Sequence, residues 1–182
     1  MFKKLVDFLH KENKIKHKLL QHKIVYTALD KAKTLNVQAQ KVLKSLVVKA
    51  GNKYYLVVLP ADKNLDLNKL KQKLNQLLKK NKGKLVDKVE IVKENWIKKN
   101  IKGVKIGNIV PFGFFWELPT IVDKSVLKIK NVIINSGDYD KSIELPSSVF
   151  KKISDLIILS GISIKKKVAD IKQKRKNKQK QR

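Results

Sequence analysis

The segment from Gly107 to Gly113, which reads GNIVPFG, contains the residue types best suited to a chemical site. Glycine allows the backbone to come close to a ligand, and a loop of this kind can point several N–H groups into one cleft. Such a cleft would stabilise an oxyanion or a phosphate group. The alternative interpretation is an ordinary turn whose aromatic neighbours pack in the core, and the local sequence alone favours it.

Lys44 is the second candidate, because it interrupts an apolar run, VLKSLVV at residues 42–48. Side chains alternate between the two faces of a strand, so Lys44 and Leu43 are expected on opposite faces. A lysine in an amphipathic strand usually faces solvent. The residues around Lys44 therefore leave open whether Lys44 belongs to a functional site or only faces solvent.

Other kinds of catalytic site find no support in the sequence. The chain has no cysteine, which excludes disulfides, thiolate metal ligands, iron–sulfur clusters and cysteine nucleophiles. His10, His17 and His22 are spaced seven and five residues apart, unlike the i, i+4 pair of a helical zinc site. We expect these histidines on the surface and predict no metal site and no cofactor. Dinucleotide-binding, P-loop and GxSxG sequences are also absent from the chain.

The pattern of apolar residues predicts the elements that would hold the two candidates. The predicted helices are an imperfect N-terminal pattern from Leu5 to Leu20 with a break around 11–16, then 28–35 with Thr27 as N-cap, 66–80, 92–99 and 146–159. The predicted extended segments are 42–48 and 54–59, joined as a hairpin at Gly51-Asn52, and then 103–110, 120–122 and 126–134. Helices and strands are mixed without strict alternation, which favours a single α/β or α+β domain over a doubly wound sheet.

The chain is strongly basic, since 43 Lys and Arg residues against 15 Asp and Glu give a formal net charge of +28 over 182 residues. A polycation of this strength attracts nucleic acid or an anionic membrane face. A lysine excess that only reflects codon usage is the alternative. No apolar run is long enough for a signal peptide or a spanning helix, so we expect a soluble, cytoplasmic protein.

Residues 165–182 form a basic tail with ten Lys or Arg residues, one Asp and three apolar residues. So little apolar surface cannot support folding by burial, and we expect a disordered or loosely helical arm that becomes ordered on a polyanion. A tail that only improves solubility is the alternative. The folded domain is predicted to span 1–164. The tail residues expected to contact nucleic acid are Lys165, Lys166, Lys167, Lys172, Lys174, Arg175 and Lys176.

Four segments occur in an order that resembles a known family. They read KVLKSLVV, YLVVLPADKNLDLNKL, GNIVPFGFFWELPTIVD and INSGDYDKSIEL. This order resembles the YbaK/prolyl-tRNA-editing-domain family of aminoacyl-tRNA deacylases, from about Thr27 to Ile157. The resemblance implies a compact editing domain with a mixed sheet flanked by helices, which hydrolyses the ester of mischarged tRNA. It implies action either in trans or as part of a synthetase, without a metal or redox cofactor.

The resemblance also implies roles for individual residues. Lys44 matches the family's functional lysine, and the segment 107–113 matches a glycine-rich loop, GxxxPxG, that lines the aminoacyl pocket. The implied catalytic residues are Lys44, Gly107 and Gly113. The implied substrate-binding residues are Thr27, Asn108, Ile109, Val110, Pro111, Phe112, Asn135, Ser136 and Gly137.

Some positions depart from the family pattern. Asn108 stands where many members have a second glycine, and Val110 where many have serine, which implies a smaller or more apolar pocket. Asp138, Tyr139 and Asp140 follow the third motif's glycine where some branches have Arg or His. Different contacts to the terminal adenosine are therefore expected.

A trans-acting deacylase is the leading hypothesis. Amides near Gly107 and Gly113 would polarise the ester carbonyl, the substrate's ribose hydroxyl would help to position a water, and Lys44 would orient the terminal adenosine. The expected partners are mischarged tRNA and, as a further candidate, an aminoacyl-tRNA synthetase, with no membrane. A catalytically weak RNA-binding protein with the same fold is the second hypothesis, and a polycation that binds anionic membrane is the third.

Overall fold

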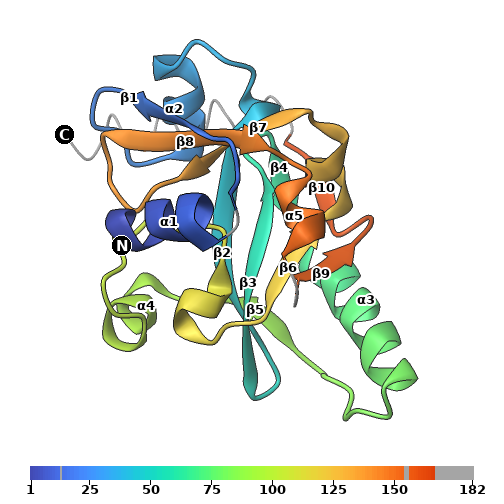
Figure 1. Cartoon of the computed structure of the whole chain (residues 1–182). Coiled ribbons are helices and arrows are strands. Elements are labelled where there is room, and N and C mark those ends of the chain that lie inside the picture. Colours follow the sequence, from blue (N-terminus) through green and yellow to red (C-terminus); the bar gives the residue numbers. More distant parts are fainter. Residues whose placement is uncertain (13, 154–155, 167–182) are drawn as a thin grey trace, which may run out of the picture.

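The computed structural model describes residues 1–12, 14–153 and 156–166, and its centre is a five-stranded sheet in the order β5-β2-β3-β6-β9 (Figure 1). The strands are β2 (Leu43–Ala50), β3 (Lys53–Pro60), β5 (Val89–Ile91), β6 (Thr120–Asp123) and β9 (Leu156–Leu159). β2 pairs antiparallel with β3 and β5, whereas β3, β6 and β9 run parallel to one another. The predicted mixed α/β fold is confirmed.

The β2–β3 hairpin is the most regular part of this sheet. Its register runs from Leu43 opposite Pro60 to Ala50 opposite Lys53. The two-residue turn begins with Gly51 at a φ of +58°, which glycine adopts at little cost. The hairpin predicted around Gly51-Asn52 is therefore confirmed.

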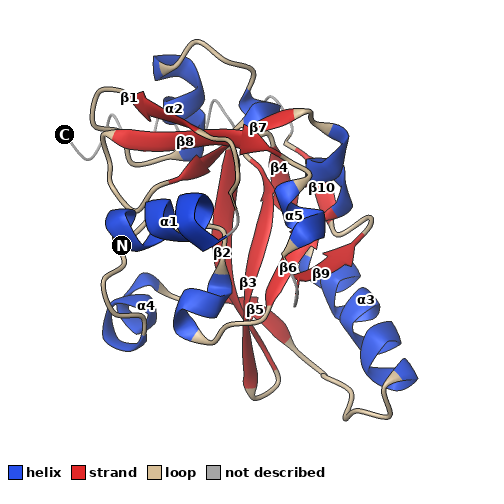
Figure 2. Ribbon diagram, viewed as in Figure 1, coloured by secondary structure: helices blue, strands red, loops and turns tan. Residues whose placement is uncertain are grey.

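A second sheet has three strands, in the order β1-β8-β7 (Figure 2). They are β1 (Lys18–Gln21), β7 (Asn131–Asn135) and β8 (Lys141–Pro146), and all pairs are antiparallel. A single parallel bridge from Val42 to Ile133 links this sheet to the start of β2. β4 (Lys63–Leu65) and β10 (Ser163–Lys165) form a separate antiparallel pair.

Helices cover both faces of the large sheet. They are α1 (Phe2–Asp7), α2 (Ala28–Thr34), α3 (Leu67–Lys80), α4 (Glu94–Asn100) and α5 (Val149–Lys152). A π-helical turn η1 (Phe8–Glu12) follows α1, and three 3-10 turns are η2 (Ala39–Lys41), η3 (Gly113–Trp116) and η4 (Lys124–Lys128). α1 and α3 lie on opposite sides of the large sheet (Figure 1).

Alternation along β3 explains these two layers. Val58 packs with Leu5 and Leu9 of the N-terminal segment, whereas Leu59 packs with Leu70 and Leu74 of α3. Fully burying a leucine side chain stabilises a fold by roughly 1.5–3 kcal/mol. The helical spacing of the leucines between 66 and 80 thus identified a helix that does pack on the sheet.

Four segments differ from the sequence predictions. Leu19 and Leu20 belong to strand β1, because they pair with Ile143 and Ser142 of β8 instead of extending the N-terminal helix. The segment 126–134 begins as the turn η4 before β7, and 103–110 forms turns instead of a strand. The helix predicted over 146–159 ends after α5, because the run LIIL pairs with β6 as strand β9.

The expected boundary at residue 164 lies inside strand β10. Lys165 pairs with Lys63, and the backbone N–H of Lys166 donates to the Asp62 carbonyl at 3.0 Å. The Lys166 ammonium also donates to the Ala61 carbonyl at 2.6 Å. Both residues, expected in the tail, therefore belong to the fold. The other expected nucleic-acid contacts, Lys167, Lys172, Lys174, Arg175 and Lys176, lie outside the described residues.

Within the part of the chain that the structure describes, no helix has the length and apolar character needed to cross a membrane.

Candidate active site

The loop from Gly107 to Gly113 begins at a position where only glycine fits. Gly107 has a φ of +79°, and a Cβ at this position would lie 2.6 Å from the carbonyl oxygen of Tyr26. The backbone of the loop therefore lies directly against the segment that precedes α2. Glycine permits this close approach to the chain's own backbone, whereas the approach to a ligand that the sequence analysis expects stays a prediction.

The side chains of the loop are buried in the core. Val110 and Phe112 are in the cluster with Leu43, and Ile109 packs with Val47. The ring of Phe112 lies 5.6 Å from that of Phe150. Pro111 is also buried. The apolar side chains thus anchor the loop in the core, as the turn interpretation supposes.

Gly113 is held by a side chain of strand β6. Its N–H donates to the Thr120 hydroxyl at 2.8 Å, and a Cβ on Gly113 would collide with the Leu118 carbonyl. This differs from the expectation that the amide near Gly113 stabilises an oxyanion, because the hydrogen bond to Thr120 already occupies that amide. Gly107 remains the candidate for backbone contact with a substrate.

A buried lysine that the sequence analysis did not single out lies beside this loop. Lys31 of α2 is 3% exposed, and its ammonium donates to the side-chain oxygens of Asn135 at 2.7 Å and Asn108 at 3.4 Å. Asn135 in turn donates from its side-chain nitrogen to the Ile109 carbonyl at 3.1 Å, and Asn108 donates to the Asp138 carbonyl. Burial lowers the pKa of the Lys31 ammonium from 10.5 to about 8.

The sequence gives little signal for this lysine. The helix reads ALDKAKT, with Lys31 and Lys33 two residues apart, and nothing in that pattern separates the buried lysine from the exposed one. Asn108 and Asn135 were both expected at the site through the family resemblance. The structure brings these two residues together through Lys31.

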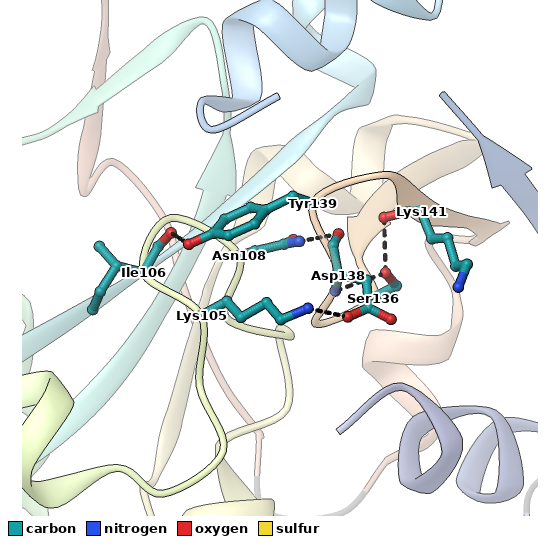
Figure 3. Close-up of polar contacts among 7 residues, drawn as sticks. All are labelled: Lys105, Ile106, Asn108, Ser136, Asp138, Tyr139 and Lys141. Atoms are coloured by element: carbon teal, nitrogen blue, oxygen red, sulfur yellow. Dashed lines mark hydrogen bonds and ion pairs between the residues drawn. The ribbon is translucent and has the colours of Figure 1, made fainter. Parts of the chain in front are cut away.

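The turn from Ser136 to Lys141 lies beside the loop (Figure 3). Lys105 and Asp138 form an ion pair at 2.5 Å, and the Tyr139 hydroxyl donates to the Ile106 carbonyl at 2.9 Å. The Ser136 hydroxyl donates to the Lys141 carbonyl at 2.7 Å and closes the turn on itself. Figure 3 shows the Lys105–Asp138 and Tyr139–Ile106 contacts crossing between the turn and the segment before Asn108.

The ion pair shifts the pKa of each partner in the direction that favours its charged form. The hydrogen bond to Asp138 raises the pKa of Lys105, and the hydrogen bond to Lys105 lowers the pKa of Asp138. Lys105 is exposed, so solvent screens the pair and its contribution to stability is small. The two residues fix the position of the turn more than they strengthen the fold.

An aromatic pair borders the loop on its solvent side. The rings of Tyr26 and Tyr139 meet edge to face with their centroids 4.8 Å apart, and Tyr26 is 60% exposed. Gly137 has a φ of +94°, and a Cβ there would lie 3.0 Å from the Met1 side chain. The end of β7 is therefore closely packed against the N-terminus.

Thr27 has a structural task in this arrangement. Its hydroxyl oxygen accepts from the backbone N–H of Asp30 at 3.1 Å and donates to the Asp30 carboxylate at 2.6 Å. This is the N-cap of α2 that the sequence predicts, and it is confirmed. The cap holds the helix that carries Lys31.

Lys44 lies on a different face from the apolar side chains of the loop. Leu43 and Val47 pack with Val110 and Ile109, whereas Lys44 alternates to the face of Leu46, which packs against the α3 cluster. Lys44 is half-buried, and its ammonium donates to the Lys63 carbonyl. These contacts place Lys44 near the end of β3. Lys63, the first residue of β4, also borders a cavity of about 390 Å³ together with Asp123 and Ser125.

Among the described residues, no group of His, Asp and Glu side chains is arranged to hold a metal ion. His22 contacts the Ser142 hydroxyl at 2.8 Å at the end of strand β1, and His17 contacts the Ile15 carbonyl at 2.8 Å. His22 therefore directly follows strand β1.

Residues 22–153 match the family model of the aminoacyl-tRNA editing domain. The chain belongs to this family. The proline–tRNA ligase of Caldicellulosiruptor saccharolyticus is 27% identical over 125 residues, which are 67% of this chain and 20% of the ligase. That of Fervidobacterium nodosum is 30% identical over 116 residues, which are 64% of this chain and 18% of the ligase. The chain thus spans about a fifth of the length of these ligases.

Solved structures share the fold of this editing domain. The hypothetical protein APE2540 aligns with a TM-score of 0.73 at 20% identity, covering 87% of this chain and 99% of that one. A candidate trans-editing enzyme for prolyl-tRNA synthetase aligns with a TM-score of 0.67 at 16% identity, covering 91% and 97% of the two chains. The editing-domain fold inferred from the four sequence segments is therefore confirmed.

Proposed function

We propose that this editing domain is an aminoacyl-tRNA deacylase, which acts in trans and hydrolyses the ester of mischarged tRNA. The observation that supports it most is the immobilised loop. Its backbone is fixed to α2, β7 and the turn 136–141 through the asparagines at 108 and 135. A preorganised backbone of this kind suits a reaction in which the enzyme must hold an activated ester and stabilise an oxyanion.

The proposed reaction needs little chemistry from side chains. The aminoacyl ester is already activated, so a positioned water and a stabilised oxyanion are sufficient for hydrolysis. Gly107 would bring backbone against the ester, next to Tyr26, whose carbonyl lies against Gly107 and whose side chain is exposed. Lys44 would bind the terminal phosphate or hydroxyl of the tRNA after rotating away from the Lys63 carbonyl.

The substrate to test first follows from the relatives. These are proline–tRNA ligases, so we propose tRNAPro charged with a small non-cognate amino acid as the first member of a panel of mischarged tRNAs. We expect the purified protein, without added metal, to release the amino acid from at least one of them faster than spontaneous hydrolysis. Spontaneous rates for every member of the panel would overturn the proposal.

Lys44 has a matched control for this assay. Lys44→Met should lower the rate on the best substrate by about 10² to 10³, the usual loss when one preorganised donor is removed. Lys49→Met changes a lysine of the same strand that carries no proposed role, and it should keep the wild-type rate. Equal rates for both variants, with unchanged circular dichroism, would remove Lys44 from the mechanism.

A catalytically weak RNA-binding protein is the second candidate. Two observations favour it: the buried Asn108 side chain fills space beside the loop, and the chain carries a net charge of +28. Tight, salt-dependent tRNA binding without turnover of any mischarged tRNA would select this candidate over the deacylase.

A further inference from the structure

Lys31 is an unusual feature of this fold, because it is a buried cation with no acidic partner among the described residues. Its side chain is 3% exposed, and within the described residues no carboxylate lies at ion-pairing distance from its ammonium. A buried charge normally costs stability unless it is paired and hydrogen-bonded. A fold that retains one beside its candidate active site therefore calls for a physical explanation.

The contacts of the ammonium supply that explanation. An ammonium group can only donate hydrogen bonds, so the side-chain oxygens of both Asn108 and Asn135 must face it. The amide nitrogens of the two asparagines must then face the other way. There they donate to the Asp138 and Ile109 carbonyls. Lys31 thus dictates the orientation of both amides.

These two amides connect elements that are far apart in the sequence. Asn108 joins the loop to the turn after β7, and Asn135 joins the end of β7 to the loop. Lys31 contributes helix α2 to the same network. The Lys31 side chain therefore fixes three elements relative to one another around the loop.

We propose that Lys31 is a positioning residue, which fixes the Gly107–Gly113 loop by orienting Asn108 and Asn135 and so sets the shape of the pocket for the aminoacyl group. The pocket part of this inference rests on the proposed function. The loop-fixing part stands on the hydrogen bonds alone. Lys31 acts through the two asparagines and is not assigned contact with the substrate.

The protonation state of Lys31 matters for this role. A neutral amine offers a lone pair and two N–H groups, so it no longer requires oxygen atoms on both asparagines. Burial lowers the pKa of Lys31 to about 8, so an opening of the network that exposes Lys31 to water takes up a proton between about pH 8 and pH 10.5. Raising the pH from 7 to 9 should therefore oppose such an opening. Of the titratable groups around it, Asp138 pairs with Lys105, the Tyr139 hydroxyl donates to Ile106, and Asp30 accepts from Thr27. The other titratable groups on the surrounding elements are His22, Lys33, Lys41, Lys44, Asp140 and Lys141.

Hydrogen exchange of the full chain tests the proposal without a substrate. The reporter is the Asn108 amide, which donates to the Lys105 carbonyl at 2.9 Å inside the network. Lys31→Met keeps the length and burial of the side chain but cannot orient the amides. We expect about tenfold faster exchange in peptides that contain residues 105–113, the effect typical of removing one buried hydrogen bond.

Lys33→Met is the matched control, because it makes the same change on the exposed face of the same helix. It should leave exchange at 105–113 as in wild type, and peptides from α3 should be unchanged in both variants. Exchange at 105–113 that is equal in Lys31→Met and Lys33→Met would overturn the proposal.

The pH dependence separates positioning from a merely structural role. Exchange at 105–113, corrected for the intrinsic exchange rate, should slow between pH 7 and pH 9 in wild type but not in Lys31→Met. Lys31→Arg keeps a permanent charge, so it should restore the wild-type protection and remove its pH dependence. A pH response at 105–113 that is identical in wild type and Lys31→Met would contradict the role assigned to the charge.

The two proposals can fail separately. Protection of the loop that depends on Lys31, in a protein without deacylase activity, would overturn the proposed function and support the positioning role. Deacylation by a protein whose loop exchange and KM are unaffected by Lys31→Met would overturn the positioning role and support the function. Where activity is found, we expect Lys31→Met to raise KM more than it lowers kcat, since the pocket shape changes.

Discussion

At the scale of single residues, the buried ammonium of Lys31 makes stability depend on pH in a defined direction. Below about pH 8 the lysine is protonated in both the folded and unfolded chain, and the folded chain bears the full cost of desolvation. Above pH 10.5 it is neutral in both states, and the cost disappears. Between these values the unfolded chain binds more protons, so the free energy of unfolding rises with pH.

A comparison with Lys31→Met separates the contribution of Lys31 to the pH dependence of stability from the contributions of the other lysines. A pKa shift from 10.5 to about 8 corresponds to roughly 3 kcal/mol. Between pH 7 and pH 10, wild type should therefore gain up to roughly 3 kcal/mol of unfolding free energy relative to the variant, measured by urea denaturation. Parallel pH profiles for the two proteins would show that the buried lysine has an ordinary pKa.

Two glycines with similar backbone angles allow a second test at this scale. Gly107 and Gly103 have φ values of +79° and +72°, but only Gly107 would bring a Cβ against another backbone atom, the Tyr26 carbonyl oxygen. Alanine at either position costs roughly 1–2 kcal/mol for the left-handed conformation. Gly107→Ala should add the cost of displacing the segment before α2.

We therefore expect Gly107→Ala to lower thermal stability more than Gly103→Ala does, as measured by calorimetry. Deacylation should fall strongly in Gly107→Ala and remain close to wild type in Gly103→Ala. If both variants keep full activity, the close approach at Gly107 has no part in the reaction.

At the scale of elements, the loop is part of the core as much as it is part of a site. Val110 is fully buried with Phe112 and Leu43, so a polar atom there has no water to contact. Val110→Ser should lower the free energy of unfolding by about 1–3 kcal/mol, measured by chemical denaturation. It should change the preference among mischarged tRNAs only through movement of the loop.

Thr34→Ser provides a control at an exposed position, at the end of α2. It should leave stability within about 0.5 kcal/mol of wild type. A Val110→Ser variant with unchanged stability and a new amino acid preference would instead place the Val110 side chain in the pocket.

Elements with strong local signals were predictable from the sequence. The Gly51-Asn52 turn between two β-branched runs specifies the hairpin, and the spacing of leucines together with the Asp66 cap specifies α3. The short apolar run LIIL was predicted as helix, because periodicity cannot distinguish a buried strand from a buried helix at that length. Its strand state is decided by pairing with β6, which lies more than thirty residues away.

The candidate site was predictable only where a motif marks it. The glycine-rich loop and the turn at Asn135 were found through the order of four segments. Lys31 was not found, because its burial depends on the packing of α2 against the end of β7. The expected joint action of Lys44 and the loop also depends on tertiary structure, and the alternation of β2 puts their side chains on different faces. The catalytic role of Lys44 therefore remains a prediction.

At the scale of the whole molecule, the distribution of charge suggests how the domain would hold a long polyanion. Residues 167–182 contain eight Lys or Arg residues and one Asp, and they follow directly after Lys166, whose backbone and side chain bind the segment 61–62. Cationic side chains add sequence-independent affinity for phosphates through release of counterions. The fold and the proposed tRNA contacts can thus be separated at residue 166.

Two truncations test this separation. A chain that ends at Lys166 should unfold at the same temperature as the full chain, because it keeps β10 and the hydrogen bonds of Lys166. Its tRNA affinity should fall, and the slope of log K against log salt should decrease by about 0.7–0.9 for each phosphate that the shortened chain no longer neutralises. A chain that ends at Ile164 should in addition be less stable, because it lacks the pairing of Lys165 with Lys63 and the hydrogen bonds of Lys166. Equal tRNA affinity and equal salt slope for the full chain and the chain ending at Lys166 would show that residues 167–182 do not touch the tRNA.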